Sequence, residues 1–370
     1  MEIAKDAKWV KFDVMEAFMK DVFKGVGVPA PDAAVCADVL ITADKLGIDS
    51  HGVSRLKPIY YDRIKQGIQL AKTRFEIVKE TPTTAVIDGH NGMGHVISVR
   101  AMNMAIKKAK KYGLGMTAVR NSTHYGIAGY HALLAAKAGM IGITGTNARP
   151  SVAPTFGVEN MLGTNPLTFA IPTDEKFPFL LDCATSITQR GKIEVYAKLG
   201  KKMPKGWVID SKGNSKTDSV AVLKDLVAGT AALAPVGGIG EELGGYKGYG
   251  YCAVVEILSA ALQQGAYMKM LLGVKDGKKV PYPLGHFFLA INIGAFTTLR
   301  SFKKIAGGIL RELRASKKMP GAKRIYTAGE KEYLNWLYRK NKGVPVNGET
   351  QKEVLAMQAE LGLKKYKFNF

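Results

Sequence analysis

The amino-acid sequence predicts an α/β protein in which a helical region precedes a domain of alternating strands and helices. Apolar residues recur at helical spacing over residues 13–46, whereas residues 75–147 alternate β-branched runs with helical stretches. Strand–helix–strand alternation is typical of an α/β domain. The C-terminal stretch from about residue 330 is again helical and basic. We expect it to fold back on the N-terminal helices and close one helical domain.

The chain is strongly basic. Its 370 residues suggest roughly two or three domains, and 53 Lys and Arg against 31 Asp and Glu give a formal net charge of +22. Such an excess favours nucleic acid, an anionic membrane or acidic small molecules as partners. The lysines are scattered and accompany no nucleic-acid-binding motif. We therefore interpret the lysine runs as solvated faces and expect no nucleic-acid partner.

Cysteine usage and hydropathy indicate a cytoplasmic protein. Cys36, Cys183 and Cys252 are far apart and form no CxxC motif, which argues against a disulfide framework or a zinc site and for a reducing compartment. The N-terminal stretch has no apolar signal core, and no apolar run reaches the length of a membrane span. We expect no membrane association and no bound metal.

The N-terminal region reads as three helices. Asp13 and Glu16 have the spacing of a capping box at the start of the first. Pro31 suits the first position of a second helix, which Gly47 ends. Ser54 is a good N-cap for a third, which we expect to run to about Lys65.

The stretch GIDSHGVSRLKPIY at residues 47–60 is the first candidate site, with Asp49, Ser50 and His51 expected in a loop just ahead of the third helix and Arg55 in its first turn. It brings a hydroxyl, an imidazole and a guanidinium close together in Ser50, His51 and Arg55. Loops held by rigid elements are where chemistry is usually located. The alternative is that Ser50 and His51 only satisfy backbone groups of the connection.

The central region alternates strands and helices, and a second candidate loop lies within it. His124 in NSTHYGIAGY (121–130) lies between a strand end and a helix start, where the helix dipole disfavours the imidazolium. That setting suits a histidine that exchanges a proton near neutral pH, and the alternative is a turn-capping histidine. We expect strands at 75–80, 83–89, 116–121 and 141–147, and helices at 95–112 and after residue 127.

Beyond residue 147 the pattern is more irregular. Residues 147–171 look rich in loops, and 201–218 look like an exposed excursion. Asp182 ends an apolar strand, where an unpartnered carboxylate would be costly to bury, so it is either a site residue or a turn-capping residue. A buried strand is expected at 285–296 and helices over 301–317.

A glycine-rich loop at 234–250 precedes an apolar helix that starts near Cys252. Such loops let backbone N–H groups approach an anion. The loop matches neither the P-loop pattern nor the Rossmann dinucleotide fingerprint. Any dinucleotide would therefore be bound without the ordinary signature.

Five motifs in order, GIDSHGVSRL, NSTHYGIAGY, GTNPLTFAIP, LLDCATS and GGYKGYG, resemble the malate/L-lactate dehydrogenase family that is unrelated to the Rossmann-type enzymes of those names. The resemblance covers about residues 10–330. It implies a non-Rossmann NAD(P)-binding domain with a mostly antiparallel sheet, at residues 76–315. The helical domain would then comprise residues 1–75 and 316–370. It also implies a homodimer.

The resemblance also implies roles for particular residues. His51 looks like the proton donor and acceptor, with Ser50 and Asp182 as relay or orienting partners. His124 matches a second acid–base histidine, and which of the two acts stays open. Arg55 matches a residue that binds the substrate carboxylate. The cofactor-contacting positions would be Asp182, Cys183, Ala184, Pro235, Lys247, Pro320 and Gly321. Cys183 replaces the usual methionine, and Ala322 replaces an acidic residue after Gly321.

These residues suit hydride transfer between a 2-hydroxy acid and a 2-oxo acid. NAD or NADP would supply the hydride, a histidine the proton, and a guanidinium the bidentate clamp on the carboxylate. Malate and oxaloacetate are the expected pair. Sulfolactate, lactate, ureidoglycolate or a cyclic imino acid are alternatives, as is a non-catalytic basic protein that binds anions or nucleic acid. The sequence distinguishes neither the acid nor NAD from NADP.

Overall fold

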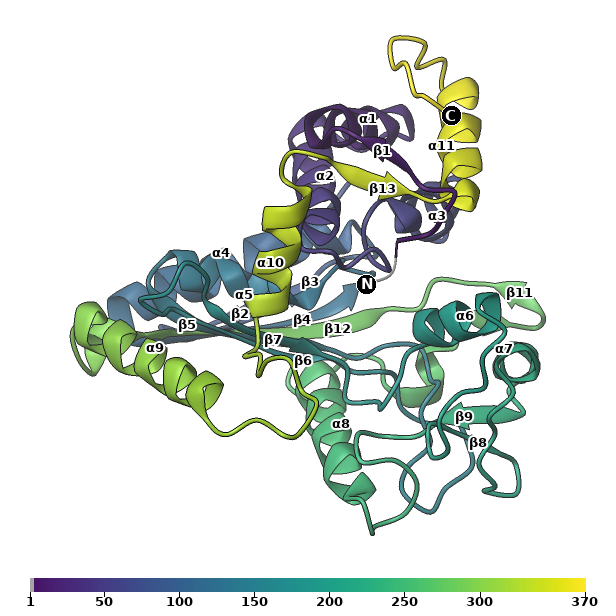
Figure 1. The fold of residues 1–370 in the computed structure, drawn as a ribbon. Coiled ribbons are helices and arrows are strands. Elements are labelled where there is room, and N and C mark those ends of the chain that lie inside the picture. The colour runs from purple at the N-terminus through teal and green to yellow at the C-terminus, as the bar shows by residue number, and fades with distance from the viewer. Residues whose placement is uncertain (1–2) are drawn as a thin grey trace.

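A computed structural model describes residues 3–370 and is built on one seven-stranded sheet (Figure 1). The strand order is β2-β3-β4-β12-β5-β6-β7. The pair β3–β4 is parallel, and the other five neighbouring pairs are antiparallel. The sheet is therefore mostly antiparallel, as the family resemblance implies. The strands are β2 (Glu76–Glu80), β3 (Thr84–Asp88), β4 (Leu114–Ser122), β5 (Met140–Thr146), β6 (Leu167–Ile171), β7 (Phe179–Cys183) and β12 (Leu284–Asn292).

The strand–helix alternation that predicted an α/β domain is present, but a parallel sheet inferred from it would be wrong. The helix α5 (Ala128–Lys137) connects β4 to β5. The late strand β12 pairs antiparallel with both of them and so lies between them. Its residues Phe288 and Ala290 share one face of the strand and are fully buried, because α4 (Gly94–Tyr112) and α5 cover that face. The local pattern of strands and helices does not reveal that β12, far away in the sequence, is inserted between β4 and β5.

Helices pack on the two faces of this sheet. Helices α4 (Gly94–Tyr112) and α5 lie on one face, and α8 (Gly245–Ala260) lies on the other (Figure 1). The strand β6 falls inside the stretch predicted to be loop-rich, so that prediction was incomplete. It is a short strand between Pro166 and Pro172, and those prolines mask its β-branched pattern.

The two ends of the chain share one hydrophobic core. Helices α1 (Phe12–Gly25) and α2 (Ala30–Lys45) pack with α11 (Gly348–Glu360). The strand β1 (Lys8–Val10) pairs antiparallel with β13 (Val344–Val346). Fully buried Phe18, Met19 and Val354 belong to this core. The exact domain boundaries, at residues 75 and 316, stay a prediction.

The third N-terminal helix differs from the expectation. A 3₁₀ turn (Val53–Arg55) leads into a π-helical turn (Leu56–Tyr61) and then a short α3 (Asp62–Lys65). Ser54 is not an N-cap, because its hydroxyl donates to the Asp49 carbonyl oxygen at 2.6 Å. Pro58 lies within the irregular turn, where its missing N–H removes one helical hydrogen bond.

A small lobe is attached beyond β7. It comprises α6 (Arg190–Lys198), β8 (Val208–Asp210), α7 (Ser219–Ala228) and β9 (Ala231–Leu233), which share a core of their own. Met203 and Val208 are buried in it. The expected exposed excursion at 201–218 is therefore wrong in part, since short polar runs there flank buried residues.

The C-terminal part then returns along the sheet. Helix α9 (Leu299–Ala315) confirms the expected helix over 301–317, and a loop connects it to α10 (Glu330–Arg339). In Figure 1, α10 stands between the sheet edge at β7 and the helical region that contains α2. In the described part of the chain, no helix is both long and apolar enough to cross a membrane. The remaining short elements are β10 (Val274–Lys275) and β11 (Lys278–Lys279), with 3₁₀ turns at Met268–Leu271 and Ile293–Ala295.

Candidate active site

The loop after α2, residues 48–55, forms one side of the candidate site, and we call it the site loop. The His51 N–H donates to the Ile48 carbonyl oxygen at 2.9 Å, which closes a tight turn. The Ser50 hydroxyl lies 2.8 Å from His51 Nδ1. Arg55 Nε donates to the Ser50 carbonyl oxygen at 2.5 Å. The three residues picked out in this stretch are therefore held together by one short hydrogen-bonded turn.

His124 comes from the loop between β4 and α5 and faces His51. Their ring centroids are 5.8 Å apart, and the planes differ by 18°. The Gly126 N–H donates to His124 Nδ1 at 3.3 Å, and the Tyr60 hydroxyl lies 2.6 Å from the same nitrogen. An Nδ1 that accepts from Gly126 carries no proton, so Tyr60 donates as well. The neutral imidazole of His124 then carries its proton on Nε2.

The surroundings disfavour a positive charge on either ring. Burial, and next the Arg55 guanidinium, lower the pKa of His51 to about 4. Burial lowers the pKa of His124 well below its usual value, and His51 adds to that effect. Both rings are thus neutral near pH 7, and two stacked imidazoles in this setting hold at most one proton readily. His124 Nδ1 is engaged by Tyr60 and Gly126, and its Nε2 carries the proton. His51 is therefore the ring suited to accept a proton, provided that it donates from Nδ1 to the Ser50 oxygen and keeps Nε2 free.

Asp182 lies on β7 and contacts neither histidine among the hydrogen bonds of the described residues. Its Oδ2 accepts from the Gly129 N–H at 2.7 Å, and the Thr168 hydroxyl donates to Oδ1 at 3.0 Å. Burial raises its pKa. A Cβ at Gly129 would lie 2.8 Å from Asp182 Oδ2, so glycine is needed for this close approach. Asp182 thereby holds the first turn of α5, directly after the loop that carries His124.

The segment after Asp182 lies against the start of the glycine-rich loop. Cys183 is exposed on the edge strand β7, and Ala184 is partly buried. Pro235 lies opposite Ser186 in an isolated β-bridge. The Val236 N–H donates to the Thr185 carbonyl oxygen at 2.9 Å. The structure therefore brings Pro235 together with the segment 182–186, although about fifty residues of chain separate them.

Lys247 and the Pro320–Gly321 turn occupy exposed positions. Helix α8 begins at Gly245 rather than near Cys252, so Lys247 lies in its first turn. Its N-cap Gly244 has φ +80° and supplies no side-chain hydrogen bond. Pro320 and Gly321 form an exposed turn, with φ +79° at Gly321. Among the described residues, no contact joins that turn to Asp182 or Lys247. The chain meets the sheet seven residues after Gly321, where the Leu180 N–H of β7 donates to the Ala328 carbonyl oxygen at 3.3 Å.

Several residues around the site loop were not anticipated. A Cβ built on Gly191, in the first turn of α6, would lie 3.8 Å from Ser50 Cβ and 4.0 Å from Arg55 Nη2. The start of α6 therefore borders the site. Tyr60 is fully buried among apolar residues, yet its hydroxyl contacts His124. In the sequence, Tyr60 lies next to Tyr61 in an apolar stretch, and nothing there distinguishes a tyrosine that only packs from one that contacts a site residue.

Buried histidines make this fold acid-sensitive, and the sign follows from their pKa values. Burial lowers the pKa to about 3 for His95 and His286 and to about 4 for His51 and His131. Unfolding restores values near 6.5, so the unfolded chain binds more protons between about pH 4 and 6.5. Stability must therefore fall as pH drops through that window, by up to about 1.4 kcal/mol per histidine and pH unit.

We expect the melting temperature to decrease steadily from pH 7 to pH 5, measured by circular dichroism at one scan rate. The substitution His131→Gln should make the dependence shallower, because it removes one of these rings, and His131 is fully buried. A melting temperature that is flat over this range would contradict the burial of these rings.

Comparison with known proteins agrees with this geometry. The family model described as malate/L-lactate dehydrogenase matches residues 10–355. A protein named malate dehydrogenase from Pyrococcus abyssi is 46% identical over 95% of this chain and 94% of its own length. L-sulfolactate dehydrogenase from Methanocaldococcus jannaschii is 38% identical over 93% of this chain and 94% of its own. The crystal structure of malate dehydrogenase from Entamoeba histolytica superposes with a TM-score of 0.94, at 44% identity, over 98% of this chain and 100% of that one.

Proposed function

The chain belongs to the malate/L-lactate dehydrogenase family, and from that premise we propose that it interconverts malate and oxaloacetate with NAD or NADP. The observation that carries the proposal is the grouping of His51, His124 and Arg55 within one hydrogen-bonded site. The names of the relatives at 46% and 43% identity, both malate dehydrogenases, support the choice of acid. Sulfolactate is the first alternative, because a relative of that name is 38% identical.

Arg55 is the proposed clamp for the substrate. Its Nε is engaged by the Ser50 carbonyl oxygen, which orients the guanidinium and leaves the Nη groups for a carboxylate. A planar fork and a carboxylate form a bidentate pair that fixes the position of the adjacent carbon. The start of α6 near Arg55 adds a partial positive charge to the same space.

His51 is the proposed proton donor and acceptor, and Ser50 orients its ring. Burial, together with the nearby Arg55 guanidinium, lowers the pKa of His51, so an anionic substrate bound to Arg55 would weaken the effect of the guanidinium and raise the pKa. The proton could then be held on the ring when it is needed for the 2-oxo acid. His124 stacks against His51, and Tyr60 fixes its tautomer. We assign Asp182 to orientation of the His124 loop through α5.

The residues present fit a nicotinamide dinucleotide, which when bound supplies the hydride. The first turn of α8 lacks a side-chain cap and carries the exposed Lys247, a setting that favours phosphate groups. The exposed edge of β7 at Cys183 and Ala184, with Pro235 beside it, offers backbone and apolar surface for the rest of the cofactor. We propose the Pro320–Gly321 turn as a further contact from the resemblance alone.

Replacing Lys247 tests the cofactor assignment. Lys247→Met should raise the dissociation constant for the reduced cofactor about 3- to 10-fold, because one exposed charge at a phosphate is worth roughly 1 kcal/mol. The effect should shrink at high salt. Fluorescence titration measures it, and Lys224→Met, at an exposed lysine of α7, is the matched control. Equal affinities in the two variants would remove Lys247 from the cofactor site.

The activity itself is tested by following nicotinamide absorbance. The protein would be given NADH or NADPH with oxaloacetate, pyruvate, sulfopyruvate and a cyclic imino acid in turn. We expect kcat/KM to be highest with oxaloacetate, and the same assay identifies the preferred cofactor. A higher kcat/KM with sulfopyruvate would move the substrate within the family. An absence of turnover with every acid, together with no binding of either cofactor, would contradict the proposal.

We further propose that the protein acts as a homodimer, on the strength of the family resemblance, and in the cytoplasm, on the strength of its cysteine usage and hydropathy. Analytical ultracentrifugation of the purified protein tests the first point, with twice the 40.0 kDa chain mass as the expected result.

A further inference from the structure

The last residue of α10, Arg339, is buried and holds the site loop. Its side chain is 3% exposed. Its two terminal nitrogens donate to the two carboxylate oxygens of Asp49, at 2.5 and 2.8 Å, and one of them also donates to the Asp44 carbonyl oxygen at 2.8 Å. Asp49 directly precedes Ser50 and His51. A bidentate pair of this kind, buried at its arginine and partly exposed at its carboxylate, fixes both the direction and the distance of the backbone that carries the carboxylate.

Asp44 holds the other end of the same loop. Its Oδ2 accepts from the Val53 N–H at 2.9 Å. A Cβ on Gly52 would lie 1.9 Å from Asp44 Oδ1, so only glycine allows the carboxylate to lie this close to the backbone. Residues 49–53 are therefore held at Asp49 by Arg339 and at Val53 by Asp44. His51 lies at the middle of this span.

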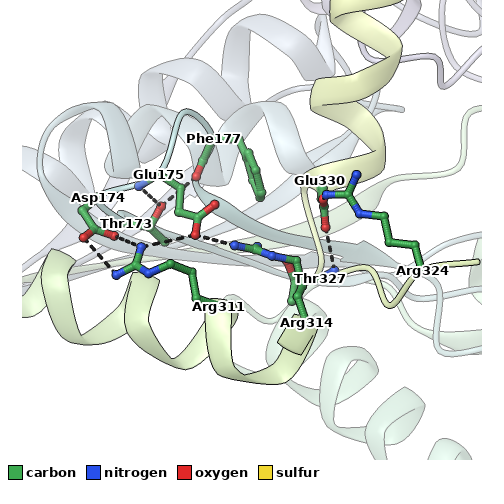
Figure 2. Close-up of polar contacts among 9 residues, drawn as sticks. All are labelled: Thr173, Asp174, Glu175, Phe177, Arg311, Arg314, Arg324, Thr327 and Glu330. Carbon is green, nitrogen blue, oxygen red and sulfur yellow. Dashed lines mark hydrogen bonds and ion pairs between the residues drawn. The ribbon is translucent and has the colours of Figure 1, made fainter. Parts of the chain in front are cut away.

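The start of α10 is itself anchored at the edge of the sheet by a cluster of ion pairs (Figure 2). Arg311 of α9 pairs with both carboxylate oxygens of Asp174, at 2.8 and 3.2 Å. Arg314 contacts Glu175 and donates to the Thr327 hydroxyl at 2.9 Å. Glu330, the first residue of α10, pairs with Arg324 and accepts from the Thr327 N–H at 3.2 Å. The side chains drawn in Figure 2 thus join α9, the β6–β7 turn and the segment before α10.

Helix α10 is therefore fixed at both ends, at the sheet near β7 and at the site loop. Asn335, in its middle, adds a hydrogen bond to the Leu46 carbonyl oxygen at 3.2 Å. A Cβ on Gly47 would lie 2.4 Å from the Asn335 side-chain nitrogen, which shows how closely the helix and the loop pack. A helix of this length is stiff compared with the loop that it contacts.

We propose that Arg339 is a positioning residue for the reaction, which sets the placement of His51 and Arg55 through Asp49. The inference rests on the proposed function, since it concerns the same site. Arg339 touches neither reacting group and acts only through the loop. Loss of its fork would leave the Asp49 carboxylate without its buried partner and let residues 49–53 move. A displacement of about 1 Å at a catalytic group costs up to roughly 100-fold in rate.

The test compares Arg339→Met and Arg339→Lys with Arg100→Met. Arg100 also forms an ion pair with an aspartate, since its Nη2 lies 2.9 Å from Oδ1 of Asp32 on α2. Among the described contacts, none joins Arg100 to the site loop. We expect kcat/KM for the 2-oxo acid to fall about 30- to 100-fold in Arg339→Met, and less in Arg339→Lys, which keeps the charge without the fork. The kcat/KM of Arg100→Met should stay within about 2-fold of that of the unmodified protein, because surface ion pairs contribute little.

Two further readouts separate positioning from a general loss of stability. Hydrogen exchange followed by mass spectrometry should speed up in peptides that cover residues 47–57 of Arg339→Met, and not in those of α4. The unmodified protein should show a constant kcat/KM for the hydroxy acid over pH 6–8. Arg339→Met should lose activity below about pH 6.5, because a more mobile and more solvent-exposed His51 returns to its ordinary pKa.

The outcomes are distinct. Faster exchange at 47–57 with a shifted pH profile supports the proposal. An unchanged pH profile, with kcat/KM per folded molecule unaltered and only a lower melting temperature, overturns it, because Arg339 is then merely structural. If the unmodified protein turns over none of the acids, the proposed function has failed. In that case, hydrogen exchange at residues 47–57 that is unchanged in Arg339→Met would still overturn the role of Arg339.

Discussion

His51→Ala is expected to lower kcat for malate oxidation by about 10²- to 10⁴-fold, the usual contribution of a positioned general base. The imidazole is neutral near pH 7 because burial and Arg55 lower its pKa to about 4, so in the resting site it is ready to accept the hydroxyl proton. The change removes that acceptor and leaves α8 and Lys247 untouched. The dissociation constant of the cofactor, measured by fluorescence, should therefore change less than about 2-fold.

Two variants serve as controls for this expectation. His90→Ala removes a histidine that is paired with Glu76 outside the site, at 2.7 Å, and should leave kcat unchanged. His124→Ala should have a smaller effect than His51→Ala, because Tyr60 and Gly126 already engage His124 Nδ1 and leave that ring no free nitrogen to accept the proton. A large loss in His124→Ala with little change in His51→Ala would exchange the roles of the two rings.

Arg55→Lys is expected to raise KM for oxaloacetate about 10- to 100-fold, with KM for the cofactor unchanged. A lysine keeps the positive charge but presents no planar fork, and a hydrogen bond to a charged group is worth roughly 1.5–3 kcal/mol. It also loses the Nε bond to the Ser50 carbonyl oxygen, so the turn that carries His51 loosens and kcat should fall as well.

Initial-rate kinetics with oxaloacetate measure this effect, and Arg100→Lys is the matched control. If KM for oxaloacetate is unchanged in Arg55→Lys, the carboxylate binds elsewhere and Arg55 is not the clamp. A rise in KM for the cofactor alone would place Arg55 with the dinucleotide instead.

Much of the fold could be predicted from local patterns. The helices over residues 12–25, 30–45 and 94–112 and the strands near residues 76–88 appear where apolar periodicity and β-branched runs indicated them. The capping box expected at Asp13 and Glu16 is wrong, because α1 begins at Phe12 and its N-cap Lys11 makes no side-chain hydrogen bond. The sheet order could not be predicted from those patterns, because β12 enters between β4 and β5 from more than a hundred residues away. Only the family resemblance pointed to an antiparallel sheet.

The candidate site shows the same division between local and distant information. Ser50, His51 and Arg55 could be singled out because a polar cluster sat in one short loop, and that loop does join them. The stacking of His124 on His51 depends on how the loop after α2 meets the loop after β4, which local sequence does not encode. The support from Arg339 joins residues 290 positions apart, and nothing near Arg339 in the sequence marks it as different from other arginines.

The central claim is that Arg55 and the stacked histidines receive the acid substrate. It is tested most directly by a crystal structure of the protein with its preferred nicotinamide cofactor and oxalate, a dicarboxylate that cannot be reduced. We predict one oxalate carboxylate paired with the Arg55 guanidinium and an oxalate oxygen within hydrogen-bonding distance of His51 or His124. Oxalate bound away from the site loop, with Arg55 and both histidines untouched, would contradict the account.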